Sequence, residues 1–169
     1  MEGVDTVTEE IIYYDTVQIE NVTVFVAATE KGLKYIKRSF EKIQAKHPDV
    51  KFVQDEQFLE PYTTQLKEYF KGERKKFDCP FDLEGTPFQK QVWKALQTIP
   101  YGETVSYLEI AKKINNEKAV RAVGGANGKN PISIMIPCHR VIQKNGHLGG
   151  YSSGLDMKEL LLSLEQRHL

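Results

Sequence analysis

Two reactive side chains are adjacent in the segment IPCHRV, residues 136–141, where Cys138 and His139 follow Pro137. A cysteine reacts as its thiolate, and a pKa of about 8.5 means that it needs a nearby base or positive charge. Adjacent residues on a strand point to opposite faces, but on a turn after a proline they need not. A buried, inert cysteine is the commoner fate of a free thiol. The neighbouring Pro137, His139 and Arg140 favour a nucleophile.

A carboxylate could complete this chemistry. Glu165 lies in LLLSLEQ, residues 160–166, beside a strongly apolar helix face. Most such glutamates are solvated, yet one at the edge of the core could orient a histidine in a Cys-His-carboxylate relay. Cys79 has no nearby histidine in FDCPFDL and is expected to serve packing or a linker. The two cysteines and four histidines lack the usual ligand spacings, so we expect no metal site.

Small side chains dominate the segment KAVRAVGGAN, residues 118–127, and include Ala122 and Gly125. Small residues let a helix approach another backbone closely, whether that backbone belongs to protein or to nucleic acid. Arg121 is the one long cation inside the segment, and it could enter a groove of DNA or replace a base in the stack. Tight helix–helix packing is the alternative interpretation.

Composition bounds the class of protein. The chain has 169 residues, of which 40% are hydrophobic and 27% charged, as in a globular protein of one domain or two small ones. The segment MEGVDTVTEE lacks the pattern of a signal peptide. No apolar run approaches the roughly 20 residues that cross a bilayer. We therefore expect no membrane association, and two cysteines without framework spacing indicate a reducing, cytoplasmic setting.

Charge is distributed unevenly along the chain. Residues 1–85 hold 12 Lys and Arg against 17 Asp and Glu, a balance of −5, whereas residues 86–169 hold 11 against 6, a balance of +5. The asymmetry predicts two domains, 1–85 and 86–169, of which the second suits a polyanion. Chance segregation of surface charge is the alternative.

The N-terminal half has the pattern of strands. Residues 21–29 and 33–40 predict a hairpin around a turn at 30–32. A helix is predicted after Pro61 and is expected to end at Gly72. Residues 75–85 are expected to form a short strand that leads into a linker.

Capping signals divide the C-terminal half. Capping boxes at Thr86 and Ser106 predict the starts of two helices, and residues 118–127 and 156–166 predict two more. The runs ISIMI and RVI predict small strands near an Asn-Gly turn. Two short helices across a tight turn, followed by a small β hairpin, are the layout of a winged helix-turn-helix. The expected fold class is α+β, with an N-terminal strand-rich α/β domain and a mostly helical C-terminal domain that contains the winged helix-turn-helix.

Four motifs, in order and with similar gaps, resemble those of the O6-alkylguanine-DNA alkyltransferases. They are TPFQKQVWKALQTIPYGETVSY, AVRAVGGANGKNPI, IPCHRV and GGYSSGLDMKELLLSLE. The resemblance covers residues 86–165, and the N-terminal half resembles the family only as a strand-rich domain. It implies direct, irreversible DNA repair. Such a protein binds the minor groove of double-stranded DNA, flips the O6-alkylguanine and moves the alkyl group to its own cysteine, which inactivates that molecule.

The resemblance also implies roles for single residues. Cys138 would accept the alkyl group, His139 would take its proton through a water, and Glu165 would hold the histidine in the useful tautomer. Asn130 would steady the loop beside the cysteine. Tyr107 would help to rotate the target phosphate and donate a proton to the departing purine.

Further residues would contact the DNA or the lesion. Arg121 would fill the gap left by the flipped base, and Ala122 and Gly125 would lie on the same DNA-binding helix. The resemblance implies no cofactor and no obligate protein partner, and a monomer would suffice. The lesion pocket would be lined by Val141, Tyr151 and Ser152, with Ser152 near the alkylated oxygen.

The sequence departs from the family in two places. Some members carry a zinc site in the N-terminal domain, for which this chain lacks the cysteines. Ser153 stands where some members have glycine, and its extra bulk puts tolerance of large O6 substituents in doubt. Acceptance of O4-alkylthymine is left open.

Three other functions fit parts of the sequence. A lesion-binding sensor of the alkyltransferase-like type would lack the acceptor cysteine, which this chain has as Cys138. A cysteine hydrolase using Cys138 and His139 would need an oxyanion hole and would leave the helix-turn-helix unexplained. A transcriptional regulator would need a sensor domain.

Overall fold

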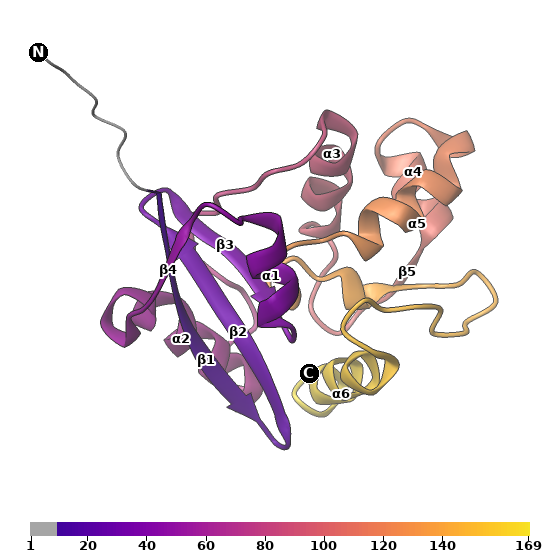
Figure 1. The fold of residues 1–169 in the computed structure, drawn as a ribbon. Coiled ribbons are helices and arrows are strands. Elements are labelled where there is room, and N and C mark those ends of the chain that lie inside the picture. The colour runs from indigo at the N-terminus through magenta and orange to yellow at the C-terminus, as the bar shows by residue number, and fades with distance from the viewer. Residues whose placement is uncertain (1–9) are drawn as a thin grey trace, which may run out of the picture.

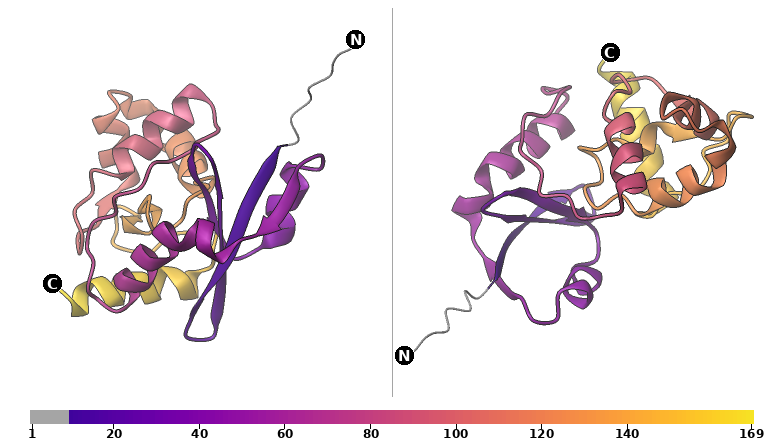
Figure 2. Two further views of the ribbon diagram at one scale, coloured as in Figure 1. Left: turned by 90° about the vertical axis from the view of Figure 1, so that its left-hand side faces the viewer. Right: turned by 90° about the horizontal axis from the view of Figure 1, so that it is seen from above.

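The computed structural model describes residues 10–169. Residues 1–9, which make up most of the acidic N-terminal segment that lacks a signal-peptide pattern, lie outside the described residues. The N-terminal half is a four-stranded sheet in the order β3-β2-β1-β4, with one helix on each face (Figures 1 and 2). Its elements are β1 (Ile11–Ile19), β2 (Val22–Thr29), β3 (Gly32–Lys37), α1 (Phe40–Lys46), β4 (Lys51–Gln54) and α2 (Glu56–Phe70).

The predicted hairpin is confirmed as the antiparallel pair of β2 and β3. The sequence prediction missed three elements: β1, α1 and β4. Strand β1 pairs antiparallel with β2 and parallel with β4. The predicted strand to residue 40 was too long, because Ser39 caps α1 by accepting a hydrogen bond from the backbone N–H of Lys42 at 3.2 Å.

Helix α2 begins before the predicted start. Asp55 caps it, since its carboxylate accepts a hydrogen bond from the N–H of Phe58 at 3.0 Å, and Pro61 lies inside the helix. The predicted end is confirmed, because Gly72 follows the helix in a left-handed conformation with φ 77°. The strand predicted within residues 75–85 is wrong. The backbone of that segment pairs with the edge of β3 only at Leu33, through hydrogen bonds of 2.9 and 2.8 Å.

The C-terminal half is mostly helical, with α3 (Pro87–Leu96), α4 (Tyr107–Lys113), α5 (Val120–Gly128) and α6 (Leu155–Arg167). Both capping boxes form as predicted, at Thr86 and at Ser106. Figure 1 shows α3, α4 and α5 grouped at one end of the molecule and α6 apart from them. The indole N–H of Trp93 on α3 donates to the carbonyl of Ala126 on α5 at 2.9 Å, which fixes the two helices together.

The small strands differ from the prediction. Residues 132–136, ISIMI, form turns instead of a strand. Residues 141–142 form β6 (Val141–Ile142), which pairs parallel with β5 (Val105–Ser106), so the predicted hairpin is wrong at this point. An apolar run is ambiguous between a strand and a buried turn, and here Ile134 adopts φ 78°, which a strand does not allow.

One hydrophobic core joins the two halves. Its buried side chains come from the α2 face of the sheet, from α2 itself and from the C-terminal helices. The other face of the sheet packs against α1 in a smaller cluster that includes Ile43. The α+β fold class predicted from the sequence is confirmed, with strands concentrated in the N-terminal half and helices in the C-terminal half. Within residues 10–169, no helix is long and apolar enough to cross a membrane.

Candidate active site

A short 3₁₀ turn, η2 (Cys138–Arg140), carries the reactive pair. Pro137 adopts φ −80° and ψ 62°, and the N–H of Cys138 donates to the carbonyl of Ile136 at 2.7 Å, which is an inverse γ-turn. The tight turn directs neighbouring side chains inward together, so Cys138 is 1% exposed and His139 0%. The structure therefore brings the two residues to one buried site.

Asn130 fixes the loop that leads to this turn. Its amide N–H donates to the carbonyl of Ile136 at 2.7 Å, and its amide oxygen accepts from the N–H of Ile132 at 3.0 Å. The same loop lies against the edge of β3, where the N–H of Ile36 donates to the carbonyl of Pro131 at 3.0 Å. The loop beside Cys138 is thus held in place both by the side chain of Asn130 and by strand β3 of the N-terminal sheet.

Glu165, on α6, receives hydrogen bonds from four residues. Its Oε2 atom is 2.7 Å from His139 Nε2, and it accepts from the Tyr69 hydroxyl at 2.5 Å and from Arg140 Nη2 at 3.0 Å. Its Oε1 atom accepts from Arg140 Nε at 2.9 Å and from the N–H of Gly102 at 3.1 Å. Burial raises the pKa of this carboxyl, but the hydrogen bonds from His139 and Arg140, together with the positive charge of Arg140, outweigh burial and place the pKa well below its usual range. Glu165 is therefore ionised.

His139 has one ring nitrogen engaged and one free. Because ionised Glu165 can only accept, the hydrogen bond between them assigns the ring proton to Nε2. Nδ1 is buried and has no hydrogen-bond partner among the described residues. Burial lowers the pKa of His139 more than Glu165 raises it, so the ring is neutral at pH 7. A neutral imidazole with a free Nδ1 lone pair can act as a base.

The thiol of Cys138 is held in its neutral form. Burial raises its pKa, and this effect exceeds the lowering by Asn130, by the charge of Lys37, by Tyr151 and by the charge of Lys158. A nucleophilic thiolate therefore requires a base at the moment of reaction, and His139 is the neighbouring candidate.

Lys158 is a buried residue that the sequence analysis missed. Its ammonium donates to the carbonyls of Val141 at 2.7 Å, Gly150 at 3.3 Å and Leu148. It thereby ties the segment between β6 and α6 to α6. A signal was present, because Lys158 lies seven residues before Glu165 and so on the same face of the helix. Tyr69, which contacts Glu165, has no role in the sequence prediction, and Arg140 enters it only as a cation near the thiol.

Two tyrosines predicted to serve the site lie near Cys138. Tyr107 begins α4, and its pKa is raised by burial and then by the charge of a Cys138 thiolate. Tyr151 has a pKa raised well above the usual value by burial and then by Cys138, and its buried hydroxyl has no well-formed hydrogen bond in residues 10–169. Val141 is fully buried in β6, whereas Ser152 is exposed next to Tyr151. The predicted pocket residues thus range from fully buried to exposed.

Helix α5 presents an open face. Arg121, Ala122 and Gly125 are exposed on it, while Val123 and Ala126 are buried on the opposite side. A β-carbon added at Gly125 would meet no atom within 4 Å. Packing inside the protein therefore does not explain the small residue at this position, which leaves room for an approaching partner.

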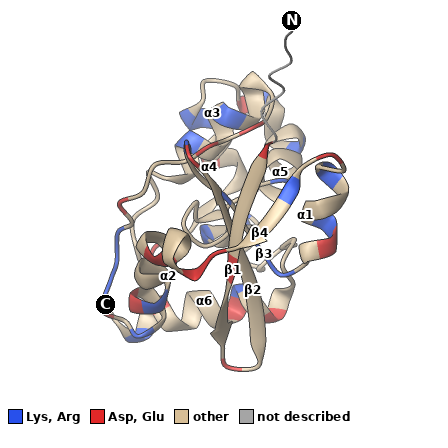
Figure 3. Ribbon diagram, turned by 60° about the vertical axis from the view of Figure 1, so that its left-hand side comes forward, with Lys and Arg blue, Asp and Glu red and all other residues tan. Residues whose placement is uncertain are grey.

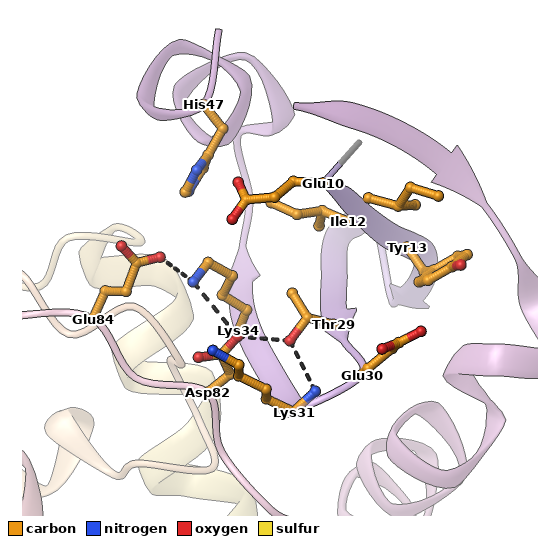
Figure 4. Close-up of a pocket in the computed structure, with 11 residues that line it drawn as sticks. Glu10, Ile12, Tyr13, Thr29, Glu30, Lys31, Lys34, His47, Asp82 and Glu84 are labelled. Carbon is orange, nitrogen blue, oxygen red and sulfur yellow. Dashed lines mark hydrogen bonds and ion pairs between the residues drawn. The ribbon is translucent and has the colours of Figure 1, made fainter. Parts of the chain in front are cut away.

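A cavity of about 580 Å³ lies in the N-terminal half, and Cys138 is not among its lining residues (Figure 4). Its polar side chains satisfy one another: Lys34 forms ion pairs with Glu84 and Asp82, and the hydroxyl of Thr29 donates to Asp82 at 2.6 Å. None of the predicted site residues lines it. Within residues 10–169, no group of three or more His, Cys, Asp or Glu side chains could hold a metal ion.

Two family models match the chain. The model described as 6-O-methylguanine DNA methyltransferase, DNA binding domain, matches residues 87–167. The model described as 6-O-methylguanine DNA methyltransferase, ribonuclease-like domain, matches residues 12–83.

Individual proteins are similar over nearly the whole chain. A methylated-DNA–protein-cysteine methyltransferase of Methanosarcina acetivorans is 51% identical over 91% of this chain and 98% of its own length. The crystal structure of the O6-methylguanine methyltransferase of Mycobacterium tuberculosis matches with a TM-score of 0.84 at 41% identity and covers 94% of each chain. A further M. tuberculosis structure, described as OGT in complex with DNA, matches with a TM-score of 0.83 at 44% identity, over 92% of this chain and 94% of that one.

Proposed function

Because the chain belongs to the 6-O-methylguanine DNA methyltransferase family and is a methylated-DNA–protein-cysteine methyltransferase, we propose that Cys138 is its alkyl acceptor. The observation that carries this proposal is the buried set of Cys138, His139 and ionised Glu165, in which His139 Nδ1 is the one ring nitrogen left free. The substrate is O6-alkylguanine in double-stranded DNA, and each protein molecule reacts once.

The proposed reaction is a single displacement. The proton of the Cys138 thiol moves through one bridging water to His139 Nδ1, and Glu165 stabilises the imidazolium that results. The thiolate attacks the alkyl carbon, a carbon–sulfur bond forms, and the bond between carbon and guanine O6 breaks. The electron pair of that bond passes to the purine, which takes a proton from Tyr107 and leaves as guanine. A thioether is stable, so neither hydrolysis machinery nor a cofactor is required.

The open face of α5 supports binding of the DNA. Arg121 projects from it, and Ala122 and Gly125 add little bulk, which suits close approach to the minor groove. Taking the target base out of the stack costs a few kcal/mol, and Arg121 would offset that cost by occupying the gap. Tyr107 begins α4, its ring lies beside Gly124 of α5, and it would rotate the target phosphate. Asn130 would keep the loop in place, and Val141, Tyr151 and Ser152 would enclose the lesion.

One site in one chain requires no second subunit, so the protein is proposed to act as a monomer without an obligate protein partner. Its two free cysteines, Cys79 and Cys138, suit the reducing cytoplasm.

The test is a mass measurement. The protein is mixed with a duplex that carries one O6-methylguanine and digested with trypsin, and the peptide containing Cys138 is weighed. We expect one added methyl group per protein molecule. Cys138→Ala should abolish the transfer, and Cys79→Ala is the matched control that should retain it. Methyl transfer that survives Cys138→Ala would contradict the proposal, lesion binding without transfer would indicate a sensor, and many product molecules per protein would indicate a turnover enzyme.

A further inference from the structure

A groove of about 480 Å³ lies where the two halves of the molecule meet, and we call it the junction groove. Cations line it from both sides. Lys37 and Arg38, at the end of β3, and Lys42 and Lys46, on α1, come from the N-terminal half, and Lys129 follows α5 in the C-terminal half. None of the twelve lining residues is acidic.

Most of this positive charge is uncompensated. Arg38 forms an ion pair with Asp156 at 3.1 Å. Lys37, Lys42, Lys46 and Lys129 form no ion pair with any carboxylate in residues 10–169. Like charges that face one another across a groove repel, and the repulsion is relieved when an anion lies between them.

The groove places basic residues of the N-terminal half on a surface that an anion can reach. The N-terminal half carries a net charge of −5, and for that reason only the C-terminal half was expected to meet a polyanion. Four of the twelve cations in residues 1–85 nevertheless line this one groove. Figure 3 shows basic residues on α1 as well as on the helices of the C-terminal half. The net charge of the half therefore hides a local basic surface.

The groove is continuous with the open face of α5. Gly128, at the last position of α5, is exposed and also lines the groove, and Lys129 follows it directly. A β-carbon at Gly128 would meet no atom within 4 Å, so this connection is unobstructed. A strand of DNA on α5 would therefore lead into the groove.

We propose that the junction groove binds the sugar–phosphate backbone of the DNA, which would extend the DNA-binding surface from α5 onto the N-terminal half. The inference rests on the proposed function, because it takes DNA as the ligand. Lysine binds phosphate as a point charge and needs no fixed geometry. Lys42 and Lys46 are four residues apart on α1 and therefore lie on the same side of that helix, where they can meet phosphates of one strand.

The experiment measures the salt dependence of binding to an unmodified duplex, using the full chain. Each phosphate contact contributes about 0.9 to the slope of log K against log salt concentration. Lys42→Gln with Lys46→Gln should lower the magnitude of the slope by about 2 and weaken binding roughly tenfold near physiological salt. Lys129→Gln, from the other side of the groove, should lower it by about 1.

The matched control is Lys67→Gln with Lys71→Gln, an exposed lysine pair with the same spacing at the end of α2. It removes the same net charge and should leave the slope near that of the wild type. A wild-type slope in the groove variants would overturn the inference. An equal loss in the α2 control would also overturn it, because the effect would then follow net charge. Melting temperatures of all variants establish that they are folded.

Failure of the proposed function is a separate result. Methyl transfer to Cys138 is measured on the wild-type protein, whereas the groove is tested by binding of undamaged DNA. Wild-type protein that binds DNA through the groove but transfers no methyl group would contradict the role of Cys138 and leave the groove in place.

Discussion

At the scale of single residues, the main property of Cys138 is that its resting thiol is protected. A residue that reacts once is lost if an oxidant or a stray electrophile reaches it first. Burial keeps Cys138 1% exposed and raises its pKa, so the nucleophilic thiolate is scarce until a base acts on it. In the proposed mechanism, His139 supplies that base.

This protection predicts the pH dependence of chemical labelling. The pKa of Cys138 is raised above the ordinary value of a thiol, so its thiolate fraction should rise about tenfold for each pH unit between pH 7 and pH 9. In a Cys79→Ala background, labelling of Cys138 by iodoacetamide, followed by mass spectrometry, should accelerate accordingly. A rate that is constant over this range would indicate a thiolate already formed at pH 7.

The sequence predicted the chemical residues better than their supports. Cys138 and His139 were adjacent in a distinctive motif, and the partner Glu165 followed from the last motif of the resemblance. Tyr69 donates to Glu165 from 96 residues away, and nothing in its local pattern distinguished it from other core residues of an amphipathic helix. Contacts between side chains that the tertiary fold alone brings together cannot be predicted from the spacing of residues in the sequence.

At the scale of elements, α6 performs two tasks on one face. Glu165 orients His139, and Lys158, two turns earlier, binds the carbonyls of the segment between β6 and α6. That segment includes Tyr151, which lies near the thiol. Any shift of α6 would therefore move both His139 and the segment that carries Tyr151.

Lys158→Met tests this second task. The substitution keeps the apolar length of the side chain but leaves three carbonyls without their donor, which should cost about 2–3 kcal/mol in the free energy of unfolding. Urea titration measures the loss. Lys144→Met is the control, since Lys144 is exposed in the same segment and its replacement should change stability by less than about 0.5 kcal/mol. Equal stability of both variants would contradict the assigned contacts.

The starts of α3 and α4 were predicted correctly because their signals are local. The capping boxes at Thr86 and Ser106 involve residues three positions apart, and both formed. Strands depend on partners elsewhere in the chain, so β1 and β4 were missed and ISIMI was taken for a strand. Its turn structure depends on Asn130, whose side chain takes the hydrogen bonds that a strand would seek from a neighbour.

At the scale of the whole molecule, the N-terminal half contributes contacts to the candidate active site. It supplies Tyr69 to Glu165 and Lys37 to the surroundings of Cys138, and its strand β3 binds the loop at Pro131. A single hydrophobic core is shared by both halves. Residues 10–85 therefore support the candidate active site structurally.

Tyr69→Phe should reveal this coupling. The change removes one hydroxyl that donates to a buried carboxylate, so the free energy of unfolding should fall by about 1.5–3 kcal/mol. Tyr62→Phe, on the same helix, is the control, because within the described residues the Tyr62 hydroxyl has no hydrogen-bond partner and the change should cost little. Unfolding by urea, followed by fluorescence of the single Trp93 in the C-terminal half, checks both. An unaltered stability of Tyr69→Phe would contradict the coupling.

The contact between the loop and β3 has a further consequence, for solubility. Strand β3 is at an edge of the sheet, where unpaired N–H and C=O groups can recruit a strand from another molecule. In this fold the edge is occupied at Leu33 by the segment around Phe81 and at Ile36 by the segment around Ile132. The loop that leads to Cys138 therefore also covers part of this edge and hinders β-pairing between molecules. Disorder in that loop would expose the edge of β3, which could then pair with a strand of another molecule and start aggregation.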